Sequence, residues 1–433
     1  FDFTQFMRWY REPGTPHVTV DGVFDAETGR YTLTCKQSNV RASDAQPYLI
    51  PLKVALFDAA GELLEGTDET LLFNETEQQF HFEGLSAEPI PSLLRDFSAP
   101  VVLNYAYTPE QLTHLLAHES DPFNAWEAGQ RLASQLILDA AKAIADGKAP
   151  VWPESFSAAA RRLLQQQNHR GAAFVAEALT LPGESTLAEA LDVVNPDALH
   201  AARNALRLHL AEELEGELAG VYAALTPHEA YQPNALQAGR RALRNVCLAY
   251  LLELNTEGSR QLAMQQFRSA DNMTDQFAAL AALAQTDCAE RELALADFYA
   301  RWQNEALVVD KWLAVQSSSR LPSTLATIKK LIDHPAFDYN NPNKVYSLIR
   351  AFGANLVRFN AADGSGYAFL AEQVKVLDAR NPQVASRVLR SFDRWRKFDP
   401  ARQAHARQAL ESVRAHAGLS RDALEIVTRA LGD

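Results

Sequence analysis

Two histidines, His114 and His118, lie four residues apart in a stretch whose apolar periodicity predicts a helix. Residues at this spacing share one helix face, so both imidazole rings could bind a single zinc ion. A zinc site needs a third protein ligand, however, and Glu119 points to another part of the helix. We therefore interpret the pair as partly exposed helix histidines, and we predict no metal ligand and no bound cofactor in this chain.

A second set of polar residues lies in the stretch 380–395, which reads as one helix. Asn381 can cap this helix, and Pro382 suits its first turn. One face then carries an amide and three cations: Gln383, Arg387, Arg390 and Arg394. A guanidinium group can bind a carboxylate with two hydrogen bonds, and we expect the positive end of the helix dipole to lie nearby. The pattern alone favours a solvated basic face, and an anion site is the alternative.

The common motifs of enzyme chemistry are missing from the sequence. It contains no HExxH, GxGxxG, GxxxxGK(S/T) or GxSxG pattern, so it lacks the zinc-protease helix, the nucleotide loops and the hydrolase elbow. Residues 363–367, DGSGY, lack the lysine and the spacing of a phosphate loop, and they predict a tight turn between helices. Asn272 is interpreted as a helix cap.

Composition excludes several classes of partner. The 433 residues are 47% hydrophobic and 22% charged, which is typical of a globular protein, and the net charge is −13. Such an acidic chain is neither a general nucleic-acid binder nor a ligand for an anionic membrane, and no apolar run reaches about 18 residues. The cysteines, Cys35, Cys247 and Cys288, are far apart, which predicts reduced thiols in the cytoplasm. We expect a monomer.

Strand patterns occupy residues 13–107. Two runs that alternate with a period of two, HVTV and RYTLTCKQ, flank the turn DAETG and predict a β-hairpin. Further short runs with closely spaced turn signals follow, as far as APVVLNYAYT. This pattern predicts a small all-β sandwich of the immunoglobulin-like type.

Helix patterns occupy residues 108–433. The first expected helix begins with Thr108 and Gln111, which are spaced as a capping box. Asn341 and Asn381, each followed by proline, lie about 40 residues apart, in the range of paired-helix repeats. The self-similarity is weak, so we predict a large all-α, HEAT/armadillo-like superhelix with irregular repeats.

Residues 1–12 fit neither of these units. The first ten, FDFTQFMRWY, are too apolar for a helix that is free in water. They read either as the last helix of a part that is absent from this chain or as a segment that lies against the β unit.

Seven segments spread along the chain carry a resemblance to a known family. They are FMRWYREPGTPHVTV, FSAPVVLNY, NMTDQFAALAAL, LVVDKWLAVQ, NPNKVYSLIRAF, DGSGYAFL and RNPQVASRVL. In this order and at these spacings, the chain resembles the C-terminal half of the bacterial aminopeptidase N family, the zinc-dependent alanyl aminopeptidases of the gluzincin class. None of the segments is a catalytic signature.

The resemblance implies a four-domain parent with an N-terminal β domain, a thermolysin-like catalytic domain, a small β-sandwich and a large helical domain. Residues 1–12 would be the last helix of the catalytic domain, 13–107 the sandwich and 108–433 the helical domain. The family's zinc ligands, glutamate base, GxMEN loop and transition-state tyrosine would lie upstream of Phe1. We therefore expect zinc in the full-length parent, carry over no catalytic residue, and predict that this chain alone is inactive.

The resemblance also implies a substrate chamber. In the family, the helical domain forms a bowl over the active site, and polar residues on its inner helices face the downstream end of the peptide. The match places Gln383, Arg387 and Tyr346 at such positions, with Lys344 nearby; relatives often have arginine in place of Tyr346. The expected partners are peptides and the chain's own upstream catalytic and N-terminal domains. The alternative function is an autonomous helical-repeat scaffold that binds a protein partner and performs no chemistry.

Overall fold

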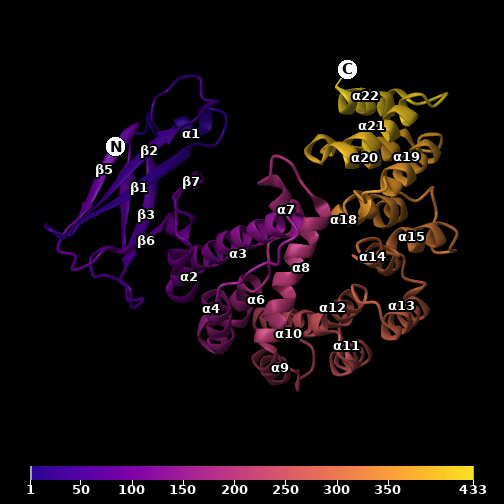
Figure 1. Ribbon diagram of the computed structural model, residues 1–433, viewed down its shortest axis with the longest axis horizontal. Helices are drawn as coiled ribbons and strands as arrows, with labels where there is room; N and C mark the ends of the chain where they lie inside the picture. Colours follow the sequence, from indigo (N-terminus) through magenta and orange to yellow (C-terminus); the bar gives the residue numbers. More distant parts are fainter. Residues whose placement is uncertain (1, 433) are drawn as a thin grey trace. The chain divides into compact units, whose positions relative to one another are not determined.

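The computed structural model describes residues 2–432, which form two compact units (Figure 1). Phe1, which begins the expected segment 1–12, and Asp433, which ends the expected segment 108–433, lie outside the described residues. The helix α3 (Pro122–Ala145) contributes residues to both units. The first unit comprises Phe1–Gln135 and Pro153–Leu179, and the second comprises Leu136–Trp152 and Thr180–Asp433.

A β-sandwich of two sheets begins the first unit. Its hairpin is the predicted one, because β1 and β2 pair antiparallel from His17 opposite Ser38 to Asp25 opposite Arg30. The four-stranded sheet has the order β5-β2-β1-β7, with β7 parallel to β1, and the other sheet has the order β4-β3-β6. The strands are β1 (His17–Asp25), β2 (Arg30–Ser38), β3 (Ile50–Phe57), β4 (Glu69–Phe73), β5 (Glu77–Phe82), β6 (Ile90–Leu93) and β7 (Val102–Asn104).

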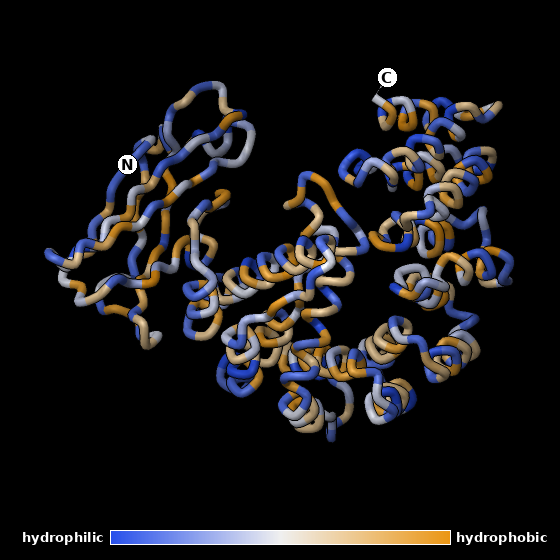
Figure 2. The backbone as a smooth tube through the Cα atoms, viewed as in Figure 1, coloured by the Kyte–Doolittle hydropathy of each residue, from blue (hydrophilic) through white to orange (hydrophobic). Residues whose placement is uncertain are grey.

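The alternating sequence pattern explains why these strands form a sandwich. In β2, the side chains of Tyr31, Leu33 and Cys35 are buried, and the residues between them are exposed or half-buried. Figure 2 shows the same alternation of apolar and polar residues along the strands. Side chains of successive residues point to opposite faces of a sheet, so one face of each sheet contributes to a shared apolar core.

The N-terminal segment lies against the sandwich, in agreement with the second of the two alternatives for it. It contains the short helix α1 (Arg8–Arg11). The indole N–H of Trp9 donates to the main-chain oxygen of Leu49 at 3.0 Å, and its ring lies 5.1 Å from that of Tyr48. Tyr10, by contrast, is 74% exposed.

Helices complete the first unit. The capping box at Thr108 and Gln111 is present as predicted, with both hydrogen bonds formed. Besides α1 and α3, the helices of this unit are η1 (Arg95–Phe97), α2 (Pro109–His118), α4 (Glu154–Gln165), α5 (Gln167–Arg170) and α6 (Ala172–Ala178). Between β6 and β7, the buried Arg95 forms an ion pair with the buried carboxylate of Glu119, after α2, at 3.0 Å.

The second unit is helical, as the sequence predicts. Asn272 and Asn381 each cap a helix through a side-chain oxygen, as predicted, and Asn341 and Asp399 cap helices in the same way. Its helices are α7 (Glu184–Glu189), α8 (Pro196–Glu213), α9 (Glu215–Ala224), α10 (Ala235–Leu251), η2 (Leu252–Leu254), α11 (Glu257–Ser269), α12 (Met273–Leu283), α13 (Ala289–Trp302), α14 (Ala306–Ser317), α15 (Thr324–Ile332), α16 (Pro342–Val345), η3 (Tyr346–Arg350), α17 (Ala351–Gly353), α18 (Leu356–Phe359), α19 (Ser365–Asp378), α20 (Pro382–Leu389), η4 (Arg390–Phe392), η5 (Trp395–Lys397), α21 (Pro400–Arg414) and α22 (Arg421–Leu431).

Amphipathic helices that pack on their neighbours in the sequence build this unit (Figures 1 and 2). The DGSGY segment begins as the predicted tight turn, in which Gly364 has a φ of 72°, a conformation that glycine adopts readily, but residues 365–367 already belong to α19. Within residues 2–432, we find no helix that combines the length and the apolar character needed to cross a membrane.

Candidate functional site

A polar cleft of about 1050 Å³ lies in the second unit. Its walls come from α7, from the segment η3 to α18, and from the segment between α20 and η5. Among the residues that line it in the described chain, five are cationic and two are carboxylates: Arg350, Arg387, Arg390, Arg394 and Lys397 against Glu189 and Asp393. The cleft is therefore basic within a chain whose net charge is −13.

The helix that carries Arg387 is shorter than the sequence predicts. We expected one helix across residues 380–395, but α20 ends at Leu389 and is followed by two 3-10 segments. Arg387 consequently lies in the last turn of α20. The expectation of a positive helix end beside it is wrong, because the C-terminal end of a helix dipole is negative and attracts the guanidinium group itself.

A π-helical segment carries two other residues of the cleft. Tyr346 begins η3 and Arg350 ends it. A π-helix has more residues in each turn than an α-helix, so residues four apart lie almost in line along its axis, and both side chains line the same cleft. The following helix packs closely, because a Cβ atom at Gly353 would lie 2.8 Å from the Cβ atom of Ser391.

Tyr346 and Arg387, two of the predicted site residues, are in contact. The Nη1 atom of Arg387 donates to the hydroxyl oxygen of Tyr346 at 3.2 Å. The guanidinium carbon of Arg350 lies 5.8 Å from the centre of the Tyr346 ring. Two cations therefore approach one half-buried phenol from different helices.

Gln383 does not join this contact. It is exposed and is not among the residues that line the cleft. Lys344, which the resemblance places nearby, is buried; its Nζ atom lies 2.8 Å from a carboxylate oxygen of Asp310 and donates to the main-chain oxygen of Ala306. Lys344 thus ties α16 to α14, and its charge is already paired with Asp310.

The other cations of the cleft are engaged by neighbours. Arg390 pairs with Asp393 at 3.0 Å, and Arg394 pairs with Glu189 at 2.7 Å. The Nζ atom of Lys397 donates to the main-chain oxygens of residues 188 and 189 at the end of α7. Among residues 2–432, no carboxylate pairs with Arg350, Arg387 or Lys397, and of these three Lys397 is held by main-chain oxygens.

The sequence interpretation missed Arg350. Its position four residues after Tyr346 was a usable signal, because residues at that spacing share a helix face. It also grouped Arg390 and Arg394 with Arg387, although each of these two forms an ion pair with a carboxylate of the cleft. Pairing with Glu189 could not be foreseen, since about 200 residues separate it from Arg394.

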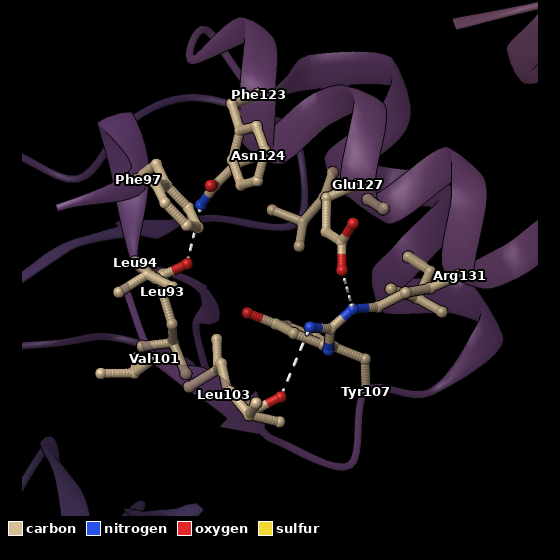
Figure 3. Close-up of a pocket in the computed structure, with 14 residues that line it drawn as sticks. Leu93, Leu94, Phe97, Val101, Leu103, Tyr107, Phe123, Asn124, Glu127 and Arg131 are labelled. Carbon is tan, nitrogen blue, oxygen red and sulfur yellow. Dashed lines mark hydrogen bonds and ion pairs between the residues drawn. The ribbon is translucent and has the colours of Figure 1, made fainter. Parts of the chain in front are cut away.

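The first unit holds a smaller, mainly apolar pocket of about 210 Å³ (Figure 3). Its polar groups satisfy one another: Arg131 donates to Glu127 at 2.8 Å, and Asn124 donates to the main-chain oxygen of Leu93 at 2.9 Å. Tyr107 also lines it, and burial raises the pKa of its hydroxyl group. Because this pocket offers no unpaired charge, the basic cleft is the stronger candidate.

His114 and His118 stack on one face of α2, with ring centres 4.7 Å apart. Burial lowers the pKa of both imidazoles. Among residues 2–432, no three histidine, cysteine, aspartate or glutamate side chains lie where they could hold one metal ion. The described residues around this histidine pair therefore do not fit a zinc site.

Family models match almost the whole chain. Residues 14–106 match a domain of unknown function with an Ig-like fold, DUF3458. Residues 109–432 match a domain of unknown function made of ARM repeats, DUF3458_C. These matches agree with the β-sandwich and the helical superhelix, which confirms the predicted fold class.

Curated relatives include three proteins named aminopeptidase N. Those of Escherichia coli and Haemophilus influenzae are each 37% identical over 440 and 441 residues, which is 99% of this chain and 50% of each relative. That of Caulobacter vibrioides is 36% identical over 436 residues, or 100% of this chain and 50% of the relative. The chain thus spans about half the length of the curated relatives it matches.

A solved structure shows the same fold. It is the crystal structure of Legionella pneumophila aminopeptidase A in complex with aspartic acid, which is 31% identical and has a TM-score of 0.85. The match covers 100% of this chain and 50% of that one. The chain therefore belongs to the family that joins an Ig-like DUF3458 domain to DUF3458_C ARM repeats, and it is homologous to the C-terminal half of bacterial aminopeptidase N.

Proposed function

We propose that this chain is the C-terminal portion of a zinc metallo-aminopeptidase that releases N-terminal amino acids from peptides. The homology to the C-terminal half of aminopeptidase N supports this function. We assign 1–12 to the end of the catalytic domain, 13–107 to the sandwich and 108–433 to the helical domain. The zinc site and the catalytic groups would belong to upstream residues, and the three unpaired cysteines favour a cytoplasmic location.

In this proposal, the basic cleft forms part of the wall of the substrate chamber. The observation that carries it is the state of Arg387, which bonds to Tyr346 and has no carboxylate partner in a cleft whose Arg390 and Arg394 are paired. A guanidinium group in this state can bind the downstream end of a short peptide, at its carboxylate or at a main-chain carbonyl. Gln383 lies one turn before Arg387, so we assign it an outer contact with the same peptide.

These residues would bind and orient the peptide, and they would take no part in bond cleavage. A peptide whose downstream end is held by Arg387 presents its amino end to the catalytic groups in a restricted set of positions. Restricting the bound geometry in this way raises the rate for substrates long enough to reach the contact. Single-residue amides are too short to gain from it.

The test is Arg387→Ala in the complete protein, assayed with tripeptides and with single-residue amides of alanine. A hydrogen bond to a charged group contributes about 1.5–3 kcal/mol, so we expect kcat/KM for tripeptides to fall about 10- to 100-fold. The value for alanine amides should stay within about 3-fold. An equal loss for both substrate types would instead support a general effect on folding or chemistry and would remove the cleft from the substrate path.

A further inference from the structure

We propose that a polar pocket at the C-terminal end of α2 binds a free α-amino acid, with the ammonium group of the ligand at Glu62 and its carboxylate at Arg162. The pocket lies within the first unit and has a volume of about 400 Å³. This inference goes beyond the proposed function, because the pocket shares no residue with the basic cleft and would hold an amino acid whether or not the chain belongs to a peptidase.

A loop of the sandwich and two helices meet at the end of α2 and form the pocket. Gly61, in the loop between β3 and β4, lies against the ring of His118, because a Cβ atom at Gly61 would overlap that ring. The Nη1 atom of Arg170, at the end of α5, donates to the main-chain oxygen of Leu116 at 3.1 Å, and its Nη2 atom donates to that of Glu119. Because α4 also packs on α2, the walls of the pocket are held in place by contacts within one unit.

The pocket contains two opposite charges that are not paired. Glu62 and Arg162 both line it and are exposed, and neither side chain forms an ion pair or a hydrogen bond with another of residues 2–432. Both charges lie near one imidazole: burial is the main cause that lowers the pKa of His118, Arg162 lowers it further, and Glu62 raises it. Opposite charges that line one pocket without meeting leave space for a ligand whose two ends complement them.

The charges around the pocket favour a zwitterion over a simple ion. Glu62 would repel an anion bound at Arg162, and the two arginines of the pocket, Arg162 and Arg170, would repel an amine bound at Glu62. The other carboxylate of the pocket, Glu119, is already paired with Arg95. An α-amino acid carries one ammonium and one carboxylate group, so it can form a charge-assisted contact with each unpaired residue.

The pocket also offers space and an apolar surface for the side chain of the ligand. Its volume lies within the range of about 300–1000 Å³ that is typical of small-molecule sites. Ala117, Pro122 and Phe174 contribute apolar atoms to the lining, and the centre of the Phe174 ring lies 4.7 Å from the guanidinium carbon of Arg170. Leucine is therefore the probe, because it combines both charges with an apolar side chain.

Equilibrium dialysis of the complete protein with radiolabelled leucine, N-acetylleucine and leucinol tests the proposal. N-acetylleucine lacks the ammonium charge, and leucinol lacks the carboxylate. Binding at the pocket is the difference from the Glu62→Gln, Arg162→Gln double variant, so that ligand held elsewhere cancels. In the wild type, we expect each derivative to bind the pocket about 5-fold more weakly than leucine, which is the effect of losing one largely exposed ion pair.

Each single variant should change the preference for one derivative only. Glu62→Gln should abolish the advantage of leucine over N-acetylleucine and keep its advantage over leucinol, because only the ammonium contact is lost. Arg162→Gln should do the reverse. Because Glu62 and Arg162 are exposed and unpaired, both variants should keep the wild-type melting temperature, which separates a loss of binding from a loss of folding.

Glu65→Gln and Arg161→Gln are the matched controls. Glu65 lies in the same loop as Glu62, Arg161 precedes Arg162 in α4, and neither lines the pocket. We expect both controls to bind leucine as the wild type does. Equal leucine binding by the wild type and the double variant, an equal loss for all three ligands in a single variant, or a loss in a control would each overturn the proposal. Since no peptide cleavage is measured, failure of the proposed function would leave this test unchanged.

Discussion

At the scale of single residues, glycines show how closely the backbone near the cleft is packed. Gly366 lies in the first turn of α19, and a Cβ atom there would overlap the carbonyl group of Phe359, with 2.8 Å to its carbon. The added Cβ atom and the carbonyl group of Phe359 are both held by the backbone, so relieving the overlap requires the backbone to shift. The second glycine of DGSGY is thus a packing requirement.

Gly366→Ala should therefore destabilise the protein by about 1–3 kcal/mol, the usual effect of overpacking. Gly220→Ala is the control, because Gly220 lies in the interior of α9 and a Cβ atom there meets no atom within 4 Å. That substitution should stabilise the helix by about 0.5–1 kcal/mol. Urea unfolding followed by circular dichroism measures both, and shifts of the same sign would contradict the packing argument.

The site residues show what the sequence could and could not predict at this scale. The contact between Tyr346 and Arg387 was within reach, because the resemblance placed both near the peptide. The distinction between an unpaired Arg387 and a paired Arg394 was not, because it depends on Glu189, a partner distant in the sequence. Whether a charged side chain in a cleft has an ion-pair partner depends on tertiary contacts, which the local sequence does not reveal.

At the scale of elements, α2 carries a pH-dependent contact. His114 and His118 stack, and burial holds the pKa of each below its ordinary value of 6.5. Asp58 opposes this shift at His114 and Glu62 opposes it at His118, whereas Arg162 adds to it at both. The unfolded chain therefore takes up protons at a higher pH than the folded one.

By linkage, the stability that depends on these histidines is complete above about pH 6.5 and is lost as the pH falls below that value. We expect the melting temperature to decrease between about pH 7 and about pH 5.5, and the decrease to be smaller in a His114→Gln, His118→Gln double variant. Differential scanning calorimetry at both pH values checks this. Equal decreases in the two proteins would show that the histidine pair is not responsible.

Helix starts were predicted better than helix ends. The caps at Asn272 and Asn381 depend on a side chain and the next few residues, so local sequence is enough. The end of α20 depends on distant contacts, because the buried Trp395 donates its indole N–H to the main-chain oxygen of Ala430. This packing outweighs the helical periodicity that continues to residue 395.

At the scale of the whole molecule, the period of two in residues 13–107 predicted the sandwich, and the helical period in residues 108–433 predicted the superhelix. The boundary between compact units did not, because α3 continues from one unit into the other with an uninterrupted amphipathic pattern. Periodicity reports which face of a helix is buried, and it does not report which neighbour buries it.

The 433-residue chain by itself should not hydrolyse alanine or leucine amides, even with added zinc. The reason is chemical, since the basic cleft offers donors and cations but no metal-binding cluster exists among residues 2–432. A chromogenic amide assay with the complete protein as the positive control measures this. Zinc-dependent turnover by the chain alone would contradict the assignment of the chemistry to upstream residues.

The contacts between α7 and the segment after α20 alter how the helical unit can come apart. An open solenoid can unzip from either end, since each repeat touches only its neighbours. Here the ion pair of Glu189 with Arg394 and the bond from the Val194 amide to Lys397 close a ring of about 200 residues. Unfolding from the C-terminal end that passes beyond α21 must break that ring, so the wall of the cleft and the helices within the ring should melt in a single step.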